Sequence, residues 1–201
     1  MPTPPTYSAD QLDRYDALMG RLERRLFPST RGWVCGRAHG ATLEVAIGTG
    51  LNLPHYPDHV ALTGVDLNPS VLPAVRRLAD SLGRDVELSA SDASGLPFGD
   101  SGFDSVVCTF ALCEVPSEAA VLAEMIRVLR PGGSLLLADH VASTSRVLRA
   151  TQRALERVTS PRAGEHFTRR PARHLAGLGV RVVESERRSA GVIEQIHAIR
   201  L

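Results

Sequence analysis

The chain has 201 residues, 43% of them hydrophobic, and a formal net charge of +1 at pH 7. A chain of this size buries a core without metals or disulfides, so we expect one domain over residues 1–201. Because acidic and basic residues nearly balance, the composition argues against binding to nucleic acid through overall charge. All 23 basic residues are arginine, which excludes lysine chemistry such as a Schiff base.

The cysteines and the N-terminus bear on the cellular compartment. The chain has three cysteines, an odd number, and they lack Cys-x-x-Cys spacing; they are Cys35, Cys108 and Cys113. This pattern favours neither a disulfide framework nor a zinc site. The first residues lack the basic and apolar regions of a signal peptide, and apolar runs such as 135–138 are too short to span a bilayer. We therefore expect a cytoplasmic protein with no integral membrane segment.

The N-terminal region has a helical pattern. Ser8 and Gln11 fit a capping box, and apolar residues then recur at helical spacing up to residue 26, before Pro28. A second, short helix is expected at residues 33–37. We expect residues 1–40 to form a helical lid on a core of residues 41–201.

From residue 41 onwards, apolar strands alternate with breaks and helices. Strands are expected at residues 41–46, 61–65, 86–89, 105–109 and 134–139, and the Asn68-Pro69 pair predicts a helix that runs to residue 82. Ser117 is expected to cap a helix at 118–130. This alternation predicts a parallel sheet covered by helices on both faces.

The C-terminal part has a different pattern. After helical stretches at 144–158 and 171–178, two strands at 180–187 and 192–200 are joined by a short turn. Strands so closely linked pair antiparallel, because a parallel crossover needs about a dozen residues. The expected fold class is an α/β three-layer sandwich with a mostly parallel seven-stranded sheet and an antiparallel last strand.

A glycine turn follows the first strand. Residues 43–52 read Leu-Glu-Val-Ala-Ile-Gly-Thr-Gly-Leu-Asn, in which Gly48 and Gly50 let a ligand approach the backbone at the start of the next helix. The dinucleotide pattern G-x-G-x-x-G fits poorly, because Leu53 stands in the place of its last glycine. Alone, this turn indicates only a nucleotide-type ligand.

Acidic residues follow the second and third strands. Asp66 could accept hydrogen bonds from both hydroxyls of a ribose, as at S-adenosylmethionine (SAM) and nicotinamide sites, or could be a turn or cap residue. Asp92 stands in the sequence Ser-Asp-Ala, which is followed by Gly-Leu-Pro-Phe at 95–98 and by the fourth strand.

In the combination of the glycine turn, Asp66, Asp92 and the Leu-Pro-Phe turn, the sequence resembles the class I SAM-dependent methyltransferases of the ubiquinone/menaquinone type. The Arg-Val-Leu-Arg-Pro-Gly-Gly turn at 127–133 strengthens the resemblance, and Ala46 stands where the family more often has glycine. The resemblance implies a Rossmann-like fold and SAM as cofactor, with S-adenosylhomocysteine as its product. It also implies that Asp92 bonds the adenine amino group and that Ala93 supplies a backbone contact. The residues expected to bind the cofactor are Tyr15, Glu44, Ala46, Ile47, Gly48, Thr49, Gly50, Asn52, Asp66, Leu67, Asn68, Asp92, Ala93, Thr109 and Phe110.

A second resemblance, to a subgroup of this family, concerns the molecule that accepts the methyl group. Residues 33–35, 108–115 and 139–141 resemble soluble bacterial relatives of the mammalian alkyl thiol methyltransferases. This implies a small-molecule acceptor, with a thiol favoured over the carbon, oxygen or nitrogen atom of a quinol, phenol, amine or natural product. The alternatives are an NAD-dependent reductase and a non-catalytic SAM-binding module.

Substrate residues are expected beyond the carboxyl ends of the fourth and fifth strands. His140 is the candidate general base, because a histidine side chain with its unperturbed pKa of about 6.5 can accept a proton at neutral pH. The alternative is that His140 has a structural role. No metal is expected, because the other histidines lack ligand spacing. We expect a monomer or homodimer and no nucleic-acid partner. The predicted substrate residues are Leu112, Cys113, Glu114, His140 and His166.

Overall fold

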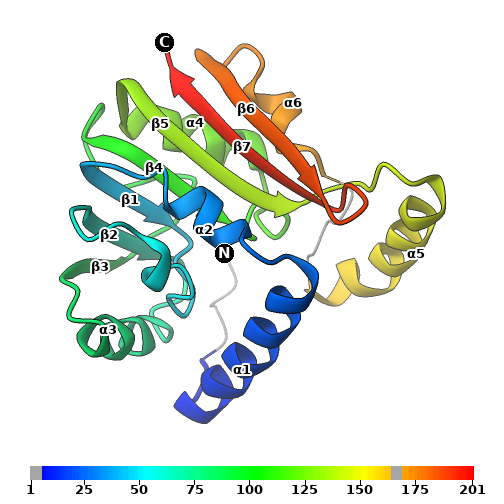
Figure 1. The fold of residues 1–201 in the computed structure, drawn as a ribbon, viewed down its shortest axis with the longest axis horizontal. Helices are drawn as coiled ribbons and strands as arrows, with labels where there is room; N and C mark the ends of the chain where they lie inside the picture. The colour runs from blue at the N-terminus through cyan, green and yellow to red at the C-terminus, as the bar shows by residue number, and fades with distance from the viewer. Residues whose placement is uncertain (1–5, 164–168) are drawn as a thin grey trace.

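The computed structural model describes residues 6–163 and 169–201, and its centre is a seven-stranded sheet (Figure 1). The strands are β1 (Ala41–Val45), β2 (Ala61–Asp66), β3 (Val86–Ala90), β4 (Phe103–Thr109), β5 (Leu129–His140), β6 (Val180–Arg188) and β7 (Ile193–Arg200). Their order is β3-β2-β1-β4-β5-β7-β6, and β7 runs antiparallel to both of its neighbours. The mostly parallel sheet with an antiparallel last strand is confirmed.

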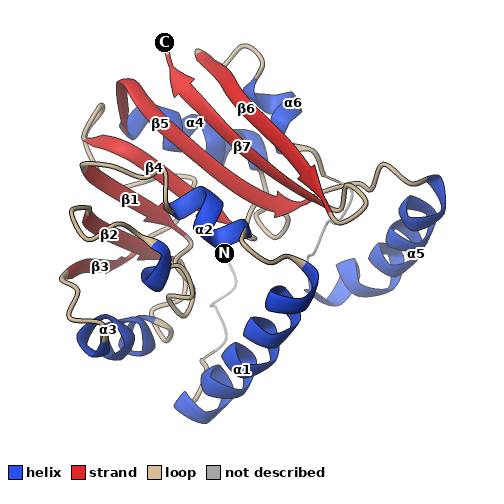
Figure 2. Cartoon of the chain, viewed as in Figure 1, coloured by secondary structure: helices blue, strands red, loops and turns tan. Residues whose placement is uncertain are grey.

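Helices cover both faces of this sheet (Figure 2). One face is covered by α2 (Thr30–Cys35) and α3 (Leu72–Ser81) and the other by α4 (Glu118–Val128) and α6 (Pro171–Leu175), whereas α1 (Ala9–Leu26) and α5 (Arg146–Ala163) extend beyond the sheet. Alternate side chains of β5 point to opposite faces, so Leu136 belongs to the core formed with α2 and α3, whereas Leu135 belongs to the core formed with α4 and α6. The three layers are therefore confirmed.

The N-terminal helix forms as expected. The Ser8 side chain accepts a hydrogen bond from the Gln11 N–H, and the Gln11 side chain accepts one from the Ser8 N–H at 2.8 Å. Leu12 is buried against Val71 and Ala74 at the start of α3. These contacts fix α1 beyond the carboxyl ends of the parallel strands, where Figure 1 shows it beside the sheet. Within the described residues, no helix has both the length and the apolar character needed to cross a bilayer.

Three local expectations were wrong. The second helix begins at Thr30, three residues before the expected start. The Asn68 side chain accepts hydrogen bonds from the N–H and the hydroxyl of Ser70, which makes a turn, so α3 begins only at Leu72.

After the glycine turn the chain forms only one 3-10 turn, η1 (Leu53–His55), rather than the expected helix. Pro57 lies two residues after its end and has no backbone donor, which removes a hydrogen bond that a longer helix would need. The glycine turn therefore precedes a short turn and not a long helix.

Candidate functional site

The turn after β1 holds its backbone in left-handed conformations. The φ angles are 57° at Ala46, 57° at Gly48 and 89° at Gly50. A Cβ at Gly48 would meet nothing within 4 Å, whereas a Cβ at Gly50 would lie 3.2 Å from the Leu53 side chain. The turn thus faces open space at Gly48 and packs against the protein at Gly50. Ala46 adopts a conformation that suits glycine better.

Two carboxylates stand beside this turn at the ends of neighbouring strands. Asp66 accepts hydrogen bonds from the N–H groups of Gly48 and Asn68, both at 2.8 Å, and burial raises its pKa. Asp92 accepts from the N–H and the hydroxyl of Ser94 at 2.8 and 2.7 Å, which lowers its pKa. The structure thus brings the glycine turn, Asp66 and Asp92 to one edge of the sheet, as expected.

Glu44 lies beneath the turn and is only 2% exposed. Its two carboxylate oxygens accept hydrogen bonds from the Asn52 amide at 2.8 Å and from the Tyr56 hydroxyl at 2.9 Å. Burial raises the pKa of Glu44 to about 7. The Asn52 amide also donates to the Thr109 hydroxyl at 2.9 Å, so these buried groups join the ends of β1 and β4.

Arg31, on α2, extends this network and was missed from the sequence. Its guanidinium group donates to both carboxylate oxygens of Glu23 at 2.6 and 2.7 Å. It also donates to the side-chain oxygen Oδ1 of Asn52 at 2.7 Å and to the Thr109 hydroxyl at 3.2 Å. One arginine among 23 basic residues carries no sequence signal, because its partners are up to 78 positions away.

The glycine turn is also tied to α1. The Thr49 hydroxyl donates a hydrogen bond to the Asp16 carboxylate at 2.5 Å. Tyr15, the neighbouring residue, is 55% exposed and so reaches the surface on the same helix. Glu23, Phe27 and Arg31 line a cavity of about 240 Å³ between α1, α2 and η1.

Aromatic rings surround His140 at the end of β5. The His140 ring centroid lies 5.1 Å from that of Phe110 and 5.8 Å from that of Phe27. The Arg31 guanidinium lies 5.0 Å above the Phe110 ring, and Phe110 itself has a φ of 55°. Burial lowers the pKa of His140 below its ordinary value, so its imidazole is neutral at pH 7.

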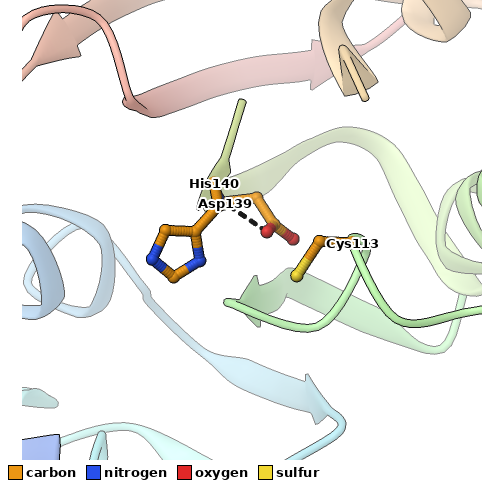
Figure 3. A group of neighbouring side chains, drawn as sticks. All are labelled: Cys113, Asp139 and His140. Carbon is orange, nitrogen blue, oxygen red and sulfur yellow. Dashed lines mark hydrogen bonds between the residues drawn. The ribbon is translucent and has the colours of Figure 1, made fainter. Parts of the chain in front are cut away.

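Asp139 and Cys113 lie beside His140 (Figure 3). Asp139 accepts hydrogen bonds from the N–H groups of Leu112 at 2.6 Å and His140 at 2.7 Å. Burial raises the pKa of Asp139 to about 6 and raises that of Cys113 above its usual range. Asp139 was not among the expected site residues.

Potential metal-binding atoms of Cys113, Asp139 and His140 all lie within 4.8 Å of one another. Burial raises the pKa of the Cys113 thiol, and this thiol donates a weak hydrogen bond to the Phe110 carbonyl oxygen at 3.9 Å. This arrangement is that of an internal hydrogen-bonded group, and the absence of a metal stays a prediction.

The remaining expected substrate residues differ in exposure. Leu112 and Cys113 are buried, with 1% and 3% of their surface exposed, and Leu112 belongs to the core next to α4. Glu114 is exposed at the same loop. His166 lies outside the described residues.

Comparison with known proteins identifies the family. Residues 43–137 match the model of a methyltransferase domain. A phosphatidylethanolamine N-methyltransferase from Cereibacter sphaeroides is 37% identical over 145 residues, which cover 71% of this chain and 71% of that protein. The chain belongs to the class I SAM-dependent methyltransferases. Its cofactor is SAM, and demethylmenaquinone methyltransferases among its relatives confirm the expected type.

Other relatives of this methyltransferase differ in the acceptor that their names give. Thiol S-methyltransferase TMT1A from Homo sapiens is 32% identical over 132 residues, 64% of this chain and 54% of that protein. The chain thus spans about half the length of its thiol methyltransferase relatives. A solved structure from Bacillus halodurans, named as a methyltransferase, superposes with a TM-score of 0.66 at 26% identity, covering 78% of this chain and 70% of that one.

The described residues fit SAM. A ligand can lie against the open backbone at Gly48, and the carboxylates of Asp66 and Asp92 are acceptors for the hydroxyl and amino donors of a nucleoside. Asp66 keeps accepting capacity beyond its two backbone partners, because a carboxylate offers about four lone-pair positions.

Proposed function

We propose that this methyltransferase acts on a small molecule whose nucleophilic atom releases a proton, and that His140 accepts this proton. The observation that carries the proposal is the position of His140 at the end of β5, packed against Phe27 and Phe110, where burial lowers its pKa. A neutral imidazole is the form that a general base needs.

The cofactor would lie along the glycine turn. Gly48 leaves room for it, Asp66 would accept hydrogen bonds from the ribose, and Asp92 would accept one from the adenine. SAM supplies an electrophilic methyl group on a positively charged sulfur. Residues proposed to complete this site are Tyr15, Glu44, Ala46, Ile47, Thr49, Gly50, Asn52, Leu67, Asn68, Ala93, Thr109 and Phe110.

The proposed contribution of the chain is alignment and proton acceptance. Positioning of two reactants can lower a barrier by up to about 7 to 11 kcal/mol. Asp139 accepts hydrogen bonds from the backbone of Leu112 and His140 and so would hold the segments after β4 and β5 in place. The rings of Phe27 and Phe110 would position the imidazole of His140. Helix α1 would act as the lid, held to the glycine turn by the bond between Asp16 and Thr49.

A thiol is the first acceptor that we propose. A thiol with a pKa of about 8.5 gives its nucleophilic thiolate with modest help from one neutral imidazole. The likeness to TMT1A, a thiol methyltransferase by name, supports this choice. An amine is the second candidate, supported by the Cereibacter sphaeroides relative, which is an N-methyltransferase by name. An ammonium group also has to lose a proton before it attacks.

The test is a panel of acceptors with SAM that carries a labelled methyl group. An alkanethiol, a primary amine, a phenol and a quinol are incubated with the protein, and products are identified by mass spectrometry. We expect label on the thiol or the amine, and a large loss of that product in His140→Ala. Label on the phenol or quinol alone would overturn the proposed acceptor class.

A further inference from the structure

A cavity of about 510 Å³ lies beyond the end of β5, between α4, α5 and α6. Arginine dominates its walls. The lining residues are Glu118, Ala142, Arg149, Arg153, Arg169, Arg170, Arg173 and His174. Neither the family nor the proposed role of His140 accounts for so much positive charge in one place.

The charge in this cavity is poorly compensated. The one carboxylate among its described lining residues, that of Glu118, lies 4.0 Å from Arg169 and 3.6 Å from His174. Among the described residues, no carboxylate lies within ion-pair distance of Arg149, Arg153, Arg170 or Arg173. Burial and the neighbouring arginines at 187, 173 and 149 lower the pKa of Arg170. Like charges gathered in this way attract an anion.

The side chains around the cavity favour phosphate over a single carboxylate. Guanidinium groups bind phosphate oxygens through paired N–H donors in a fixed geometry. A phosphate monoester carries up to two charges and three oxygens, so several guanidinium groups can bind it at once.

The cavity adjoins the proposed methyl-transfer site. Ala142 follows His140 by two residues, so their Cα atoms are at most about 7 Å apart. Arg169, on the wall of the cavity, donates hydrogen bonds to the carbonyl oxygens of Leu112 at 2.8 Å and Val115 at 2.5 Å. The arginine cavity and His140 therefore lie at the same end of β5.

We propose that the cavity formed by Arg149, Arg153, Arg170 and Arg173 binds a phosphate group of the methyl acceptor. This inference rests on the proposed function, because it names the substrate class of the same site. The phosphate belongs either to a soluble phosphate ester or to the headgroup of a phospholipid. Arg169 is a positioning residue, since it holds the loop from Leu112 to Val115.

The test measures binding without turnover, in the full chain with SAM present. The two probes are O-phosphoethanolamine, titrated by calorimetry, and vesicles of phosphatidylcholine with one fifth phosphatidylglycerol, followed by co-sedimentation. The variant is Arg170→Ala with Arg173→Ala. Its matched control is Arg76→Ala with Arg77→Ala, which removes the same charge from the exposed face of α3.

We expect at least one probe to bind, and its affinity to fall about tenfold or more in the cavity variant but less than about twofold in the control. Binding of O-phosphoethanolamine identifies a soluble phosphate ester, and binding of vesicles alone identifies a lipid headgroup. The proposal is overturned if neither probe binds, or if both double variants lose binding equally. SAM affinity is measured in parallel and should be the same in both double variants as in the wild type. The acceptor panel with His140→Ala tests the proposed function separately, so the phosphate result stands by itself.

Discussion

The backbone N–H of Gly48 donates a hydrogen bond of 2.8 Å to the carboxylate of Asp66. This bond joins the turn after β1 to the end of β2, which are the two segments that the cofactor would contact. The second oxygen of Asp66 accepts from the Asn68 N–H at 2.8 Å, so the carboxylate is held in one orientation by the backbone on both sides. Its position therefore does not depend on a bound ligand.

Asp66→Ala should weaken SAM binding about 100-fold, because hydrogen bonds to a charged group contribute about 1.5–3 kcal/mol each. Isothermal titration calorimetry measures the affinity. Asp80→Ala is the control, since Asp80 is exposed on α3 and its loss should leave the affinity unchanged. An Asp66→Ala protein that is folded and binds SAM like the wild type would refute the role given to this carboxylate.

His140→Ala should lower kcat for a thiol acceptor about 100-fold at pH 7, in the range for a lost general base. Above the thiol pKa of about 8.5 the acceptor is already deprotonated, so the defect should shrink at pH 10. Because burial lowers the pKa of His140 below its ordinary value of about 6.5, wild-type activity should fall only when the pH drops below that value. A defect of equal size from pH 7 to pH 10 would indicate a packing role instead.

Glu44→Gln should flatten the dependence of stability on pH. Burial raises the pKa of Glu44 to about 7 in the folded chain, whereas an unfolded glutamate has a pKa of about 4.3. The folded state therefore binds a proton that the unfolded state releases, and this stabilisation, complete below about pH 4.3, is lost as the pH rises through about 7.

Urea unfolding at pH 5 and pH 7.5 measures this effect in both proteins. The wild type should lose more unfolding free energy between the two values than Glu44→Gln does. Asp139, whose pKa burial raises to about 6, contributes a slope of the same sign to both proteins and so cancels in the comparison. Equal slopes in wild type and variant would contradict the buried, raised-pKa carboxyl at position 44.

Ala46→Gly should leave stability unchanged or raise it by up to about 1 kcal/mol. Ala46 has a φ of 57°, and the left-handed conformation costs a residue with a Cβ about 1–2 kcal/mol, which exceeds the added entropy of glycine in the unfolded chain. Ala123→Gly, on the exposed face of α4, is the matched control and should cost about 1 kcal/mol. Thermal unfolding compares them, and equal losses would argue against strain at Ala46.

Local patterns in the sequence predicted most of the fold, because each depends on residues close in the chain. The capping box of Ser8 and the apolar runs of the strands are such patterns. The 3-10 turn at 53–55 and the late start of α3 were missed because side chains and prolines nearby compete with helix formation.

The site was predictable only where its residues follow strands directly. The glycine turn, Asp66 and Asp92 carry that signal. Arg31 does not, since its role comes from contacts with Glu23, Asn52 and Thr109 that only folding brings together. The arginine cavity likewise draws on α5, α6 and the segment after β5, so no stretch of sequence displays it.

Mass spectrometry of reactions that contain methyl-labelled SAM and a pool of acceptors tests the central claim most directly, because it detects transfer without assuming the acceptor. The pool contains thiols and amines, each with and without a phosphate group. We predict labelled product from a phosphate-bearing thiol or amine, an equal amount of S-adenosylhomocysteine, and loss of both in Asp66→Ala. Tight SAM binding with no label transferred to any acceptor would contradict the account.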